Sequence, residues 1–240
     1  MRRANSGPTL TYTIQDYLKG IYELTELGEP ATTNAIAARL GVSAASVTGM
    51  VQKLASQRPA LVLYKKHQGA RLTNNGRRAA LEVIRHHRLL EAWLVRTLGY
   101  SWDEVHGEAE RLEHAMSEDM ENRISRALGN PARDPHGEPI PSADLVMPRD
   151  RSVPLSELSV GQHAIVQRVQ TPDTAALRHL ADLGVRIGTI LTVMSVSAYE
   201  PLLTLRIRGH SREVTVGPAL AQRVYVERID NTDERNLASL

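Results

Sequence analysis

The 240-residue sequence contains no cysteine. Disulfide bonds and thiolate metal ligands are therefore excluded. The sequence also lacks any run of eighteen apolar residues, so we expect no membrane span. The basic N-terminus MRRANS is not followed by an apolar stretch, which argues against a signal peptide. Together these absences favour a protein of the reducing cytoplasm.

Acidic residues are missing from one long segment. Residues 30–80 contain no Asp or Glu but eight Lys or Arg, although the net charge of the whole chain is only +2. Residues 1–80 carry a net charge of +7, and residues 81–240 carry a net charge of −5. A segment of this kind is attracted to a polyanion such as DNA, with chance local bias as the alternative.

The basic region has the pattern of a helix-turn-helix. Apolar spacing predicts an amphipathic helix over 12–24, with Thr13 as its N-cap and Asp16 three residues on. Thr32 or Thr33 is expected to begin a short helix that ends at Gly41, and Ser43 to begin a second helix over 44–55. Two short helices joined in this way form a helix-turn-helix.

Two β-prone runs, 61–64 and 70–73, follow with a basic turn between them and predict a hairpin wing. On the second helix, small hydroxyl side chains would allow close approach to the major groove, and basic side chains on the wing would reach phosphates. The alternative is a three-helix unit that binds no nucleic acid. The predicted DNA-binding residues are Ser43, Ala45, Ser46, Thr48, Gln52, Lys53, Lys65, Lys66 and Arg71.

The rest of the chain is helical first and β later. Helices are expected over 77–98, from an N-cap at Ser101 to about 114, and from an N-cap at Ser117 to about 128. The proline-rich stretch 129–155 predicts an ordered meander or linker. Five strands then follow in about seventy-five residues, which suggests a small barrel, and the polar tail is expected to fray. The expected strands are 162–169, 190–197, 202–208, 212–216 and 223–228, with one helix at 174–183.

Two groups of residues indicate metal binding. On a helix at about 100° per residue, His106, Glu110, Glu113 and His114 fall within an arc of about 100°. Two imidazoles and two carboxylates on one stripe suit a hard-to-borderline metal ion, whereas a solvated charged face is the alternative.

His87 and Glu91 form the second group, because they occupy positions of the packed seam where apolar side chains are expected. A buried carboxylate needs a partner, which can be a metal ion or a hydrogen-bonded histidine.

These motifs, in this order, resemble the metal-dependent repressors typified by the diphtheria toxin repressor and the manganese transport regulators. The similarity covers about 12–141. It rests on six motifs: DYLKGIYEL at 16–24, IAARL at 36–40 with SVT at 46–48, LTNNGR at 72–77, HRLLE at 87–91, VHGEAERLEH at 105–114 and GEPIP at 137–141. LADLGVRIG at 180–188 looks like a loop–strand signature of the small SH3-like domain of ferrous-iron transport accessory proteins.

The resemblance implies a mainly α fold with a β C-terminal domain. The expected parts are a winged helix-turn-helix DNA-binding domain (1–76), a helical metal-binding and dimerisation domain (77–141), a proline-rich linker (142–154), an SH3-like, FeoA-like β-barrel (155–230) and a flexible tail (231–240). It further implies a cytoplasmic homodimer that binds double-stranded operator DNA when a divalent metal is bound.

Carried over by position, the family's primary metal site falls on Asp16, Glu110, Glu113 and His114. The ancillary site falls on His87, Glu91 and His106, and Asp173, together with Gln170, is the match in the barrel domain that would complete it.

The ligand types imply which metal is sensed. Iron-type relatives have Met at the position of Asp16 and Cys at that of Glu110, whereas manganese-type relatives have carboxylates. Hard oxygen donors favour Mn(II), with Fe(II) as the alternative cofactor. Lys19 stands where manganese-type relatives offer a second carboxylate, which argues against a closely spaced two-metal site.

The sequence therefore predicts a repressor of manganese or iron homeostasis genes, with an iron-responsive repressor as the alternative. A metallohydrolase that uses the same His and Glu residues is the remote alternative. We expect no enzyme, because no general base is spaced by a recognisable motif.

Overall fold

The computed structural model describes residues 10–26, 28–197 and 199–229. The N-terminal sequence MRRANS and the predicted tail 231–240 lie outside these residues. The chain divides into two compact units, each described here by itself. The first, called the N-terminal unit, comprises Met1–His87, Glu113–Met116 and Pro141–Met147, and the remainder forms the C-terminal unit. Among the described residues, no helix is long and apolar enough to cross a bilayer.

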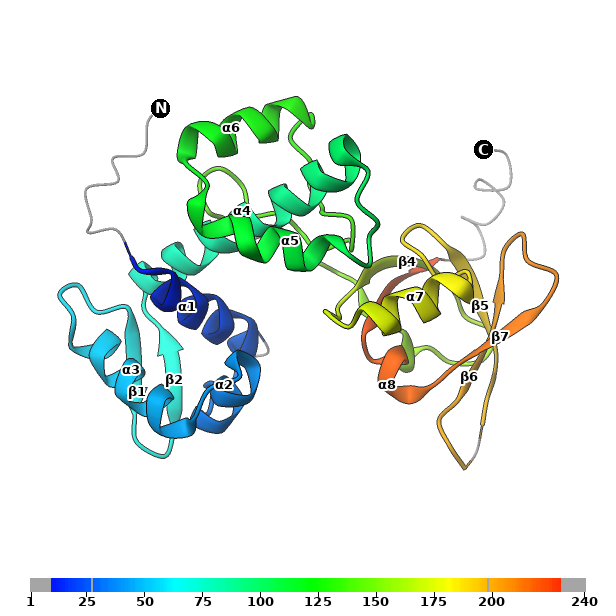
Figure 1. Ribbon diagram of the computed structural model, residues 1–240. Helices are drawn as coiled ribbons and strands as arrows, with labels where there is room; N and C mark the ends of the chain where they lie inside the picture. The colour runs from blue at the N-terminus through cyan, green and yellow to red at the C-terminus, as the bar shows by residue number, and fades with distance from the viewer. Residues whose placement is uncertain (1–9, 27, 198, 230–240) are drawn as a thin grey trace. The chain divides into compact units, whose positions relative to one another are not determined.

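The N-terminal unit begins with helix α1, Tyr12–Thr25 (Figure 1). Its N-cap is Thr11, whose hydroxyl accepts a hydrogen bond from the Ile14 amide. The predicted cap at Thr13 is therefore wrong, because the helix starts earlier and Thr13 already lies in its first turn. Asp16 consequently has no capping-box position, and its side chain is available for other contacts.

Helices α2, Thr33–Leu40, and α3, Ala44–Ser56, confirm the helix-turn-helix. Thr32 and Ser43 cap them as predicted, through hydrogen bonds from the amides of Ala35 and Ser46. Between the helices, Gly41 has a φ of 66°, a left-handed conformation that glycine adopts without steric cost and that lets the chain reverse into α3.

The wing is an antiparallel pair of strands, β1 (Val62–Lys65) and β2 (Gly69–Leu72). Helix α4, Asn74–Leu98, begins three residues before its predicted start. Its first turn contains Gly76, where an added Cβ would lie 2.0 Å from the Leu61 carbonyl oxygen. Only glycine allows the helix to begin directly against the wing.

One apolar core joins α1, α2, α3, the wing and the start of α4. Leu145, from the proline-rich stretch predicted to be a meander or linker, is buried in this core, and Met147 packs against it. The largest fully buried side chains of this core are Leu18, Ile21, Ile36, Leu54 and Leu81.

Helix α5, Val105–Leu112, is shorter than the helix predicted from Ser101 to His114. Ser101 does not cap a helix at that point: its hydroxyl donates to the Glu104 carboxylate, and residues 102–104 form a turn. After Leu112 the chain tightens into a 3₁₀ turn, Glu113–Ala115. Glu113 and His114 therefore lie beyond the end of α5, in a turn whose hydrogen bonds join residues three apart rather than four.

Helix α6, Glu118–Ala127, starts at the predicted N-cap Ser117. The following stretch contains no helix, as expected from its prolines. It is ordered by backbone hydrogen bonds, including the Asp134 amide to the Glu138 carbonyl and a bridge between Arg133 and Pro139.

A six-stranded antiparallel sheet forms the remainder of the C-terminal unit, in the order β3-β8-β4-β5-β6-β7. The five predicted strands are confirmed to within one residue at each end, and helix α7, Thr174–Asp182, replaces the predicted 174–183. The short elements β3, α8 and a 3₁₀ turn at Leu155–Glu157 were not predicted, since each is too short to show a periodicity. The bounds are Val153–Pro154 (β3), His163–Val169 (β4), Ile190–Val196 (β5), Leu203–Ile207 (β6), Glu213–Val216 (β7), Pro218–Ala221 (α8) and Val224–Ile229 (β8).

The LADLGVRIG motif is not a loop followed by a strand. Its first residues end α7, Gly184 makes a turn at a φ of 79°, and β5 starts only at Ile190. Leu180 and Val185 are fully buried in the core of the sheet domain, so the motif fastens the helix to the sheet.

Candidate metal centres and DNA-binding surface

Three predicted metal ligands meet in the N-terminal unit. Asp16 comes from α1, and Glu113 and His114 from the 3₁₀ turn. Each offers one ligand atom, and these atoms lie within 4.8 Å of one another. His114 Nε2 is 2.9 Å from Asp16 Oδ1 and 3.6 Å from Glu113 Oε1. We refer to Asp16, Glu113 and His114 as the first cluster.

The ring of His114 is held by two further residues of α1. Its Nδ1–H donates to Gln15 Oε1 at 2.6 Å, and its ring stacks on Tyr12 with centroids 4.8 Å apart. With the proton held on Nδ1, Nε2 is the nitrogen that can offer a lone pair to a metal ion. Gln15 and Tyr12 thus orient His114 without belonging to the predicted ligand set.

Glu113 is the most enclosed member of the first cluster. Its two oxygens lie 3.0 and 2.8 Å from the Lys19 ammonium, and one of them accepts a hydrogen bond from His87 Nδ1. Burial alone would raise the pKa of Glu113, but the contacts with His87 and Lys19 outweigh it and lower the pKa below its usual value. Glu113 is therefore ionised and ready to bind a cation.

The donor set of the first cluster fits a divalent ion of the Mn(II) or Fe(II) type. Carboxylate and imidazole donors suit such ions, and the chain has no thiolate to favour softer ones. Burial raises the pKa of Asp16, which means that the folded protein leaves this carboxylate poorly solvated. A positive charge next to Asp16 and Glu113 would offset that cost.

Glu110 is not one of the residues that form the first cluster. It lies on α5, where its carboxylate is 3.4 Å from His106 Nε2, and it is not among the atoms grouped with Asp16. Glu113 lies in the 3₁₀ turn that follows α5, where the Lys19 ammonium and His87 contact its oxygens. Its place in the primary site stays a prediction.

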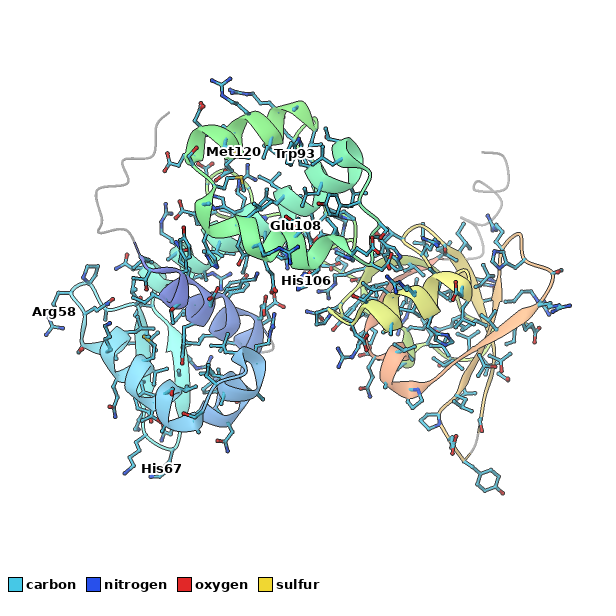
Figure 2. All side chains as sticks on the ribbon, viewed as in Figure 1. Arg58, His67, Trp93, His106, Glu108 and Met120 are labelled. Atoms are coloured by element: carbon cyan, nitrogen blue, oxygen red, sulfur yellow. The ribbon has the colours of Figure 1, made fainter. Side chains whose placement is uncertain are left out.

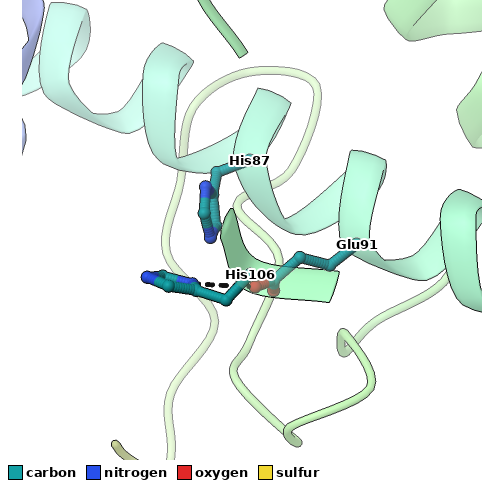
Figure 3. A group of neighbouring side chains, drawn as sticks. All are labelled: His87, Glu91 and His106. Carbon is teal, nitrogen blue, oxygen red and sulfur yellow. Dashed lines mark hydrogen bonds and ion pairs between the residues drawn. The ribbon is translucent and has the colours of Figure 1, made fainter. Parts of the chain in front are cut away.

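The predicted ancillary residues also group together. His87 and Glu91 are one turn apart on α4, and α5 supplies His106, so that one ligand atom from each lies within 4.8 Å of the others (Figure 3). His106 Nδ1 is 3.1 Å from Glu91 Oε1. Burial opposes protonation of His106, but hydrogen bonds to Glu110 and Glu91 outweigh it and raise the pKa of His106 to about 9. A metal ion would have to displace that proton.

A third group was missed by sequence reasoning. Glu91, Asp134 and His136 are all buried and bring ligand atoms within 4.8 Å of one another. His136 Nδ1 is 3.5 Å from Glu91 Oε2, whereas His106 Nδ1 is 3.1 Å from Glu91 Oε1. Burial together with the Glu91 charge raises the pKa of Asp134. Asp134 and His136 lie in the irregular stretch after α6, where no helical or strand period marks residues as neighbours.

Asp173 does not join these groups. It is exposed and caps α7, where its carboxylate accepts hydrogen bonds from the amides of Ala175 and Ala176. Its part in the ancillary site stays a prediction, and the structure gives it a local structural role.

The predicted DNA-binding residues lie mostly on the surface. Ser43, Ala45, Ser46, Gln52 and Lys53 are exposed on α3, while Val47, Val51 and Leu54 face the core. Thr48 is half-buried, and its hydroxyl donates to the Ala44 carbonyl. This hydrogen bond uses the proton that the hydroxyl would otherwise donate to DNA.

On the wing, Lys65, Lys66 and Arg71 are exposed. His67 lies in the turn between the two strands, with a φ of 66° (Figure 2). The wing therefore presents three basic side chains to solvent, as phosphate contacts require.

A winged helix-turn-helix combined with clusters of metal-ligating side chains defines a metal-dependent DNA-binding regulator. The chain matches "Iron dependent repressor, N-terminal DNA binding domain" over residues 9–70, "Iron dependent repressor, metal binding and dimerisation domain" over 73–142, and "FeoA domain" over 153–228.

Similar proteins agree with these matches. The chain is 37% identical to the iron-dependent repressor IdeR of Mycobacterium leprae (strain TN) over 92% of its length and 99% of that protein. It is 30% identical to the diphtheria toxin repressor of Corynebacterium diphtheriae, with 92% and 99% covered. A solved manganese-dependent transcriptional repressor in complex with manganese is 39% identical, with 90% of this chain and all of that chain covered and a TM-score of 0.83.

The chain belongs to the iron-dependent repressor family of metal-dependent transcriptional repressors. The predicted family, the fold class and the repressor function are thereby confirmed.

Proposed function

We propose that this protein is a Mn(II)-activated repressor that binds operator DNA as a homodimer in the cytoplasm. The observation that carries the proposal is the first cluster, in which two carboxylates and one imidazole meet on α1 and the 3₁₀ turn. The target genes are those that control the cell's supply of manganese or iron.

The choice of Mn(II) over Fe(II) rests on ligand chemistry. Asp16 gives the first cluster a hard oxygen donor, and Glu110 would add another if it turned from His106. Oxygen-rich sites favour Mn(II) by geometry and ligand type, although Fe(II) binds similar donors with comparable or higher affinity. Iron activation is the runner-up, because curated relatives include iron-dependent repressors.

A second ion would be held around Glu91. Its two carboxylate oxygens face His106 on one side and His136 on the other, so this residue can anchor a metal with either neighbour. We propose Glu91 as the essential ligand there, with His87, His106, Asp134 and His136 as the candidates around it.

The link to DNA binding follows from the chain. Asp16 lies on α1, which packs with α2 and α3 in one core. Glu113 and His114 follow directly after α5, in the region that matches the dimerisation domain. The ion would supply the positive charge that holds these carboxylates together. A metal ion that joins α1 to the residues after α5 would restrict the position of α3, the recognition helix, in each subunit. In a dimer, the two copies of α3 must match the spacing of two DNA half-sites.

The experiment that tests the proposal is operator binding against Mn(II), Fe(II) and Zn(II) at fixed salt, with the bound metal counted in parallel. We expect saturating Mn(II) to give the largest increase in operator affinity, because the preference rests on geometry and ligand type rather than on the tightest binding. A larger increase with Fe(II) than with Mn(II) would favour the runner-up. An operator affinity that does not depend on metal would contradict both readings. Cleavage of the operator DNA in the presence of metal would point to the metallohydrolase instead.

The variant Asp16→Ala tests the site itself. Asp16 is half-buried and contributes a carboxylate rather than packing, so the variant should fold normally but lose Mn(II)-dependent DNA binding. Asp182→Ala is the matched control, since it removes an exposed carboxylate from the end of α7 that belongs to none of the clusters of metal-ligating residues. Retained metal-dependent binding by Asp16→Ala would show that Asp16 is not a ligand.

A further inference from the structure

A buried lysine, Lys19, lies next to the first cluster. The Lys19 side chain lies on α1, one turn after Asp16, and is only 7% exposed. Its ammonium lies 2.8 and 3.0 Å from the two Glu113 oxygens and 3.3 Å from His87 Nδ1. Lysine is almost never buried unless it is paired, so the position of this ammonium depends on Glu113.

The partner of Lys19 is what makes this pair unusual. Glu113 is a member of the first cluster, and Lys19 contacts both of its oxygens. An ammonium has three donors and no lone pair, so it cannot itself bind a metal ion. Lys19 and a metal ion therefore compete for the same negative charge.

Stabilisation of the fold alone does not explain the buried ion pair between Lys19 and Glu113. Buried ion pairs contribute little net stability, because the cost of removing both charges from water cancels most of their attraction. A second ion pair in the same unit shows the contrast. Arg39 pairs with Glu23 at 2.8 Å, but both side chains are more than a quarter exposed and neither belongs to a cluster of metal-ligating residues.

We propose that Lys19 is a built-in cation that neutralises Glu113 while no metal is bound, and thereby sets the metal concentration that the first cluster requires. The inference rests on the proposed function, because it takes Asp16, Glu113 and His114 as metal ligands. An incoming ion has to share Glu113 with the ammonium and is repelled by it at short range. Lys19 thus makes the regulator less sensitive to metal than its ligands alone would.

The test is to remove the charge of Lys19 while keeping a hydrogen-bond donor, in the full chain, with Mn(II) alone as the probe. Lys19→Gln should bind Mn(II) about tenfold tighter or more, because the variant removes the short-range repulsion between the ammonium and the metal ion. Lys19→Arg keeps the charge and should not bind more tightly. Arg39→Gln removes a positive charge that is paired to a non-ligand carboxylate, and should leave the affinity unchanged.

Thermal unfolding gives a second readout, which does not depend on DNA binding. In chelator, Lys19→Gln should melt below the wild type, because Glu113 loses its counter-charge. In saturating Mn(II) its melting temperature should rise by more than that of the wild type, since tighter binding stabilises the native state further. If the variant folds only when Mn(II) is present, the ion has replaced the ammonium, which also supports the proposal.

Three results would overturn it: Mn(II) affinity of folded Lys19→Gln equal to or weaker than that of the wild type, equal tightening in Arg39→Gln, or failure of Lys19→Gln to fold even in saturating Mn(II). Asp16→Ala separates this inference from the proposed function. If Asp16→Ala loses Mn(II) but Lys19→Gln gains nothing, only the role of Lys19 is wrong. If Asp16→Ala binds Mn(II) like the wild type, the metal site and the role of Lys19 fail together.

Discussion

The side chain of Gln15 determines which nitrogen of His114 faces the carboxylates of the first cluster. Its amide oxygen accepts the Nδ1 proton at 2.6 Å, while Nε2 points to Asp16. Partners of this kind fix the tautomer of a metal-binding histidine and raise its basicity. At the residue scale, the site thus depends on one face of α1, whose members Tyr12, Gln15, Asp16 and Lys19 recur at helical spacing.

Gln15→Leu should weaken Mn(II) binding by about 10- to 100-fold, the usual effect of losing such a partner, because the ring of His114 loses the acceptor that holds its proton on Nδ1. Titration of the purified variant with Mn(II) measures this loss. Gln15→Glu keeps an acceptor at the same place and should retain or improve binding. If Gln15→Leu binds Mn(II) like the wild type, the hydrogen bond does not orient the ligand.

At the scale of elements, the wing and α3 carry the expected DNA contacts in different ways. The exposed side chains of α3 are small or uncharged apart from Lys53. The wing, in contrast, carries three exposed basic side chains. Base edges are read by short side chains held close to the groove, and phosphates are bound by long cationic ones. The wing should therefore supply affinity, and α3 sequence preference.

Replacing both Lys65 and Lys66 by Gln should weaken operator binding and lower the steepness of its salt dependence. Each lost phosphate contact reduces the slope of log K against log salt by about 0.9, so the slope should fall by about 2. Fluorescence anisotropy at several salt concentrations measures it. The paired change Arg206→Gln with Arg208→Gln removes two exposed charges from the sheet domain, and is expected to leave the slope as it is. An unchanged slope in the wing variant would exclude these lysines from the interface.

Element boundaries show where local patterns were sufficient. Ser43, Thr32, Gly41 and Ser117 mark helix ends through hydrogen bonds within four residues, so the sequence predicts them well. The end of α5 was predicted wrongly, because its charged residues continue the helical period through His114 while the backbone tightens after Leu112. The hydrogen bond from His87 to Glu113, from a distant part of the chain, forms only in the folded protein.

On the scale of the whole molecule, the proposed dimer needs an apolar surface. Among the described residues of the region that matches the dimerisation domain, several large apolar side chains are exposed, including Leu98, Leu112 and Met120. Exposed apolar side chains of this kind are the usual core of a subunit interface. We expect the two copies to meet through them.

Met120→Asp should raise the dissociation constant of the dimer by about tenfold or more, because a carboxylate buried at an interface has no partner there. Sedimentation equilibrium measures it. Val160→Asp places the same charge on an exposed apolar position of the sheet domain, and is expected to keep the dimer intact. If both variants dimerise like the wild type, the interface lies elsewhere.

The sequence by itself determined the order of the main elements, the acid-free region of the winged helix-turn-helix and the ligand types of the candidate metal sites. These features depend on periodicity, capping residues and composition, which are local properties of the chain. Helical spacing indicates Glu113, His114, His87, Glu91 and His106 as candidate ligands, and the resemblance to metal-dependent repressors adds Asp16 and the division into two sites.

Only the tertiary structure decided which of these residues meet and what surrounds them. It brought Asp16 to Glu113 and His114, and added Asp134 and His136 to Glu91. It also buried Lys19 against Glu113, although 94 residues separate them. Contacts between residues so far apart arise from packing of several elements around one core, and no short-range pattern in the sequence records them.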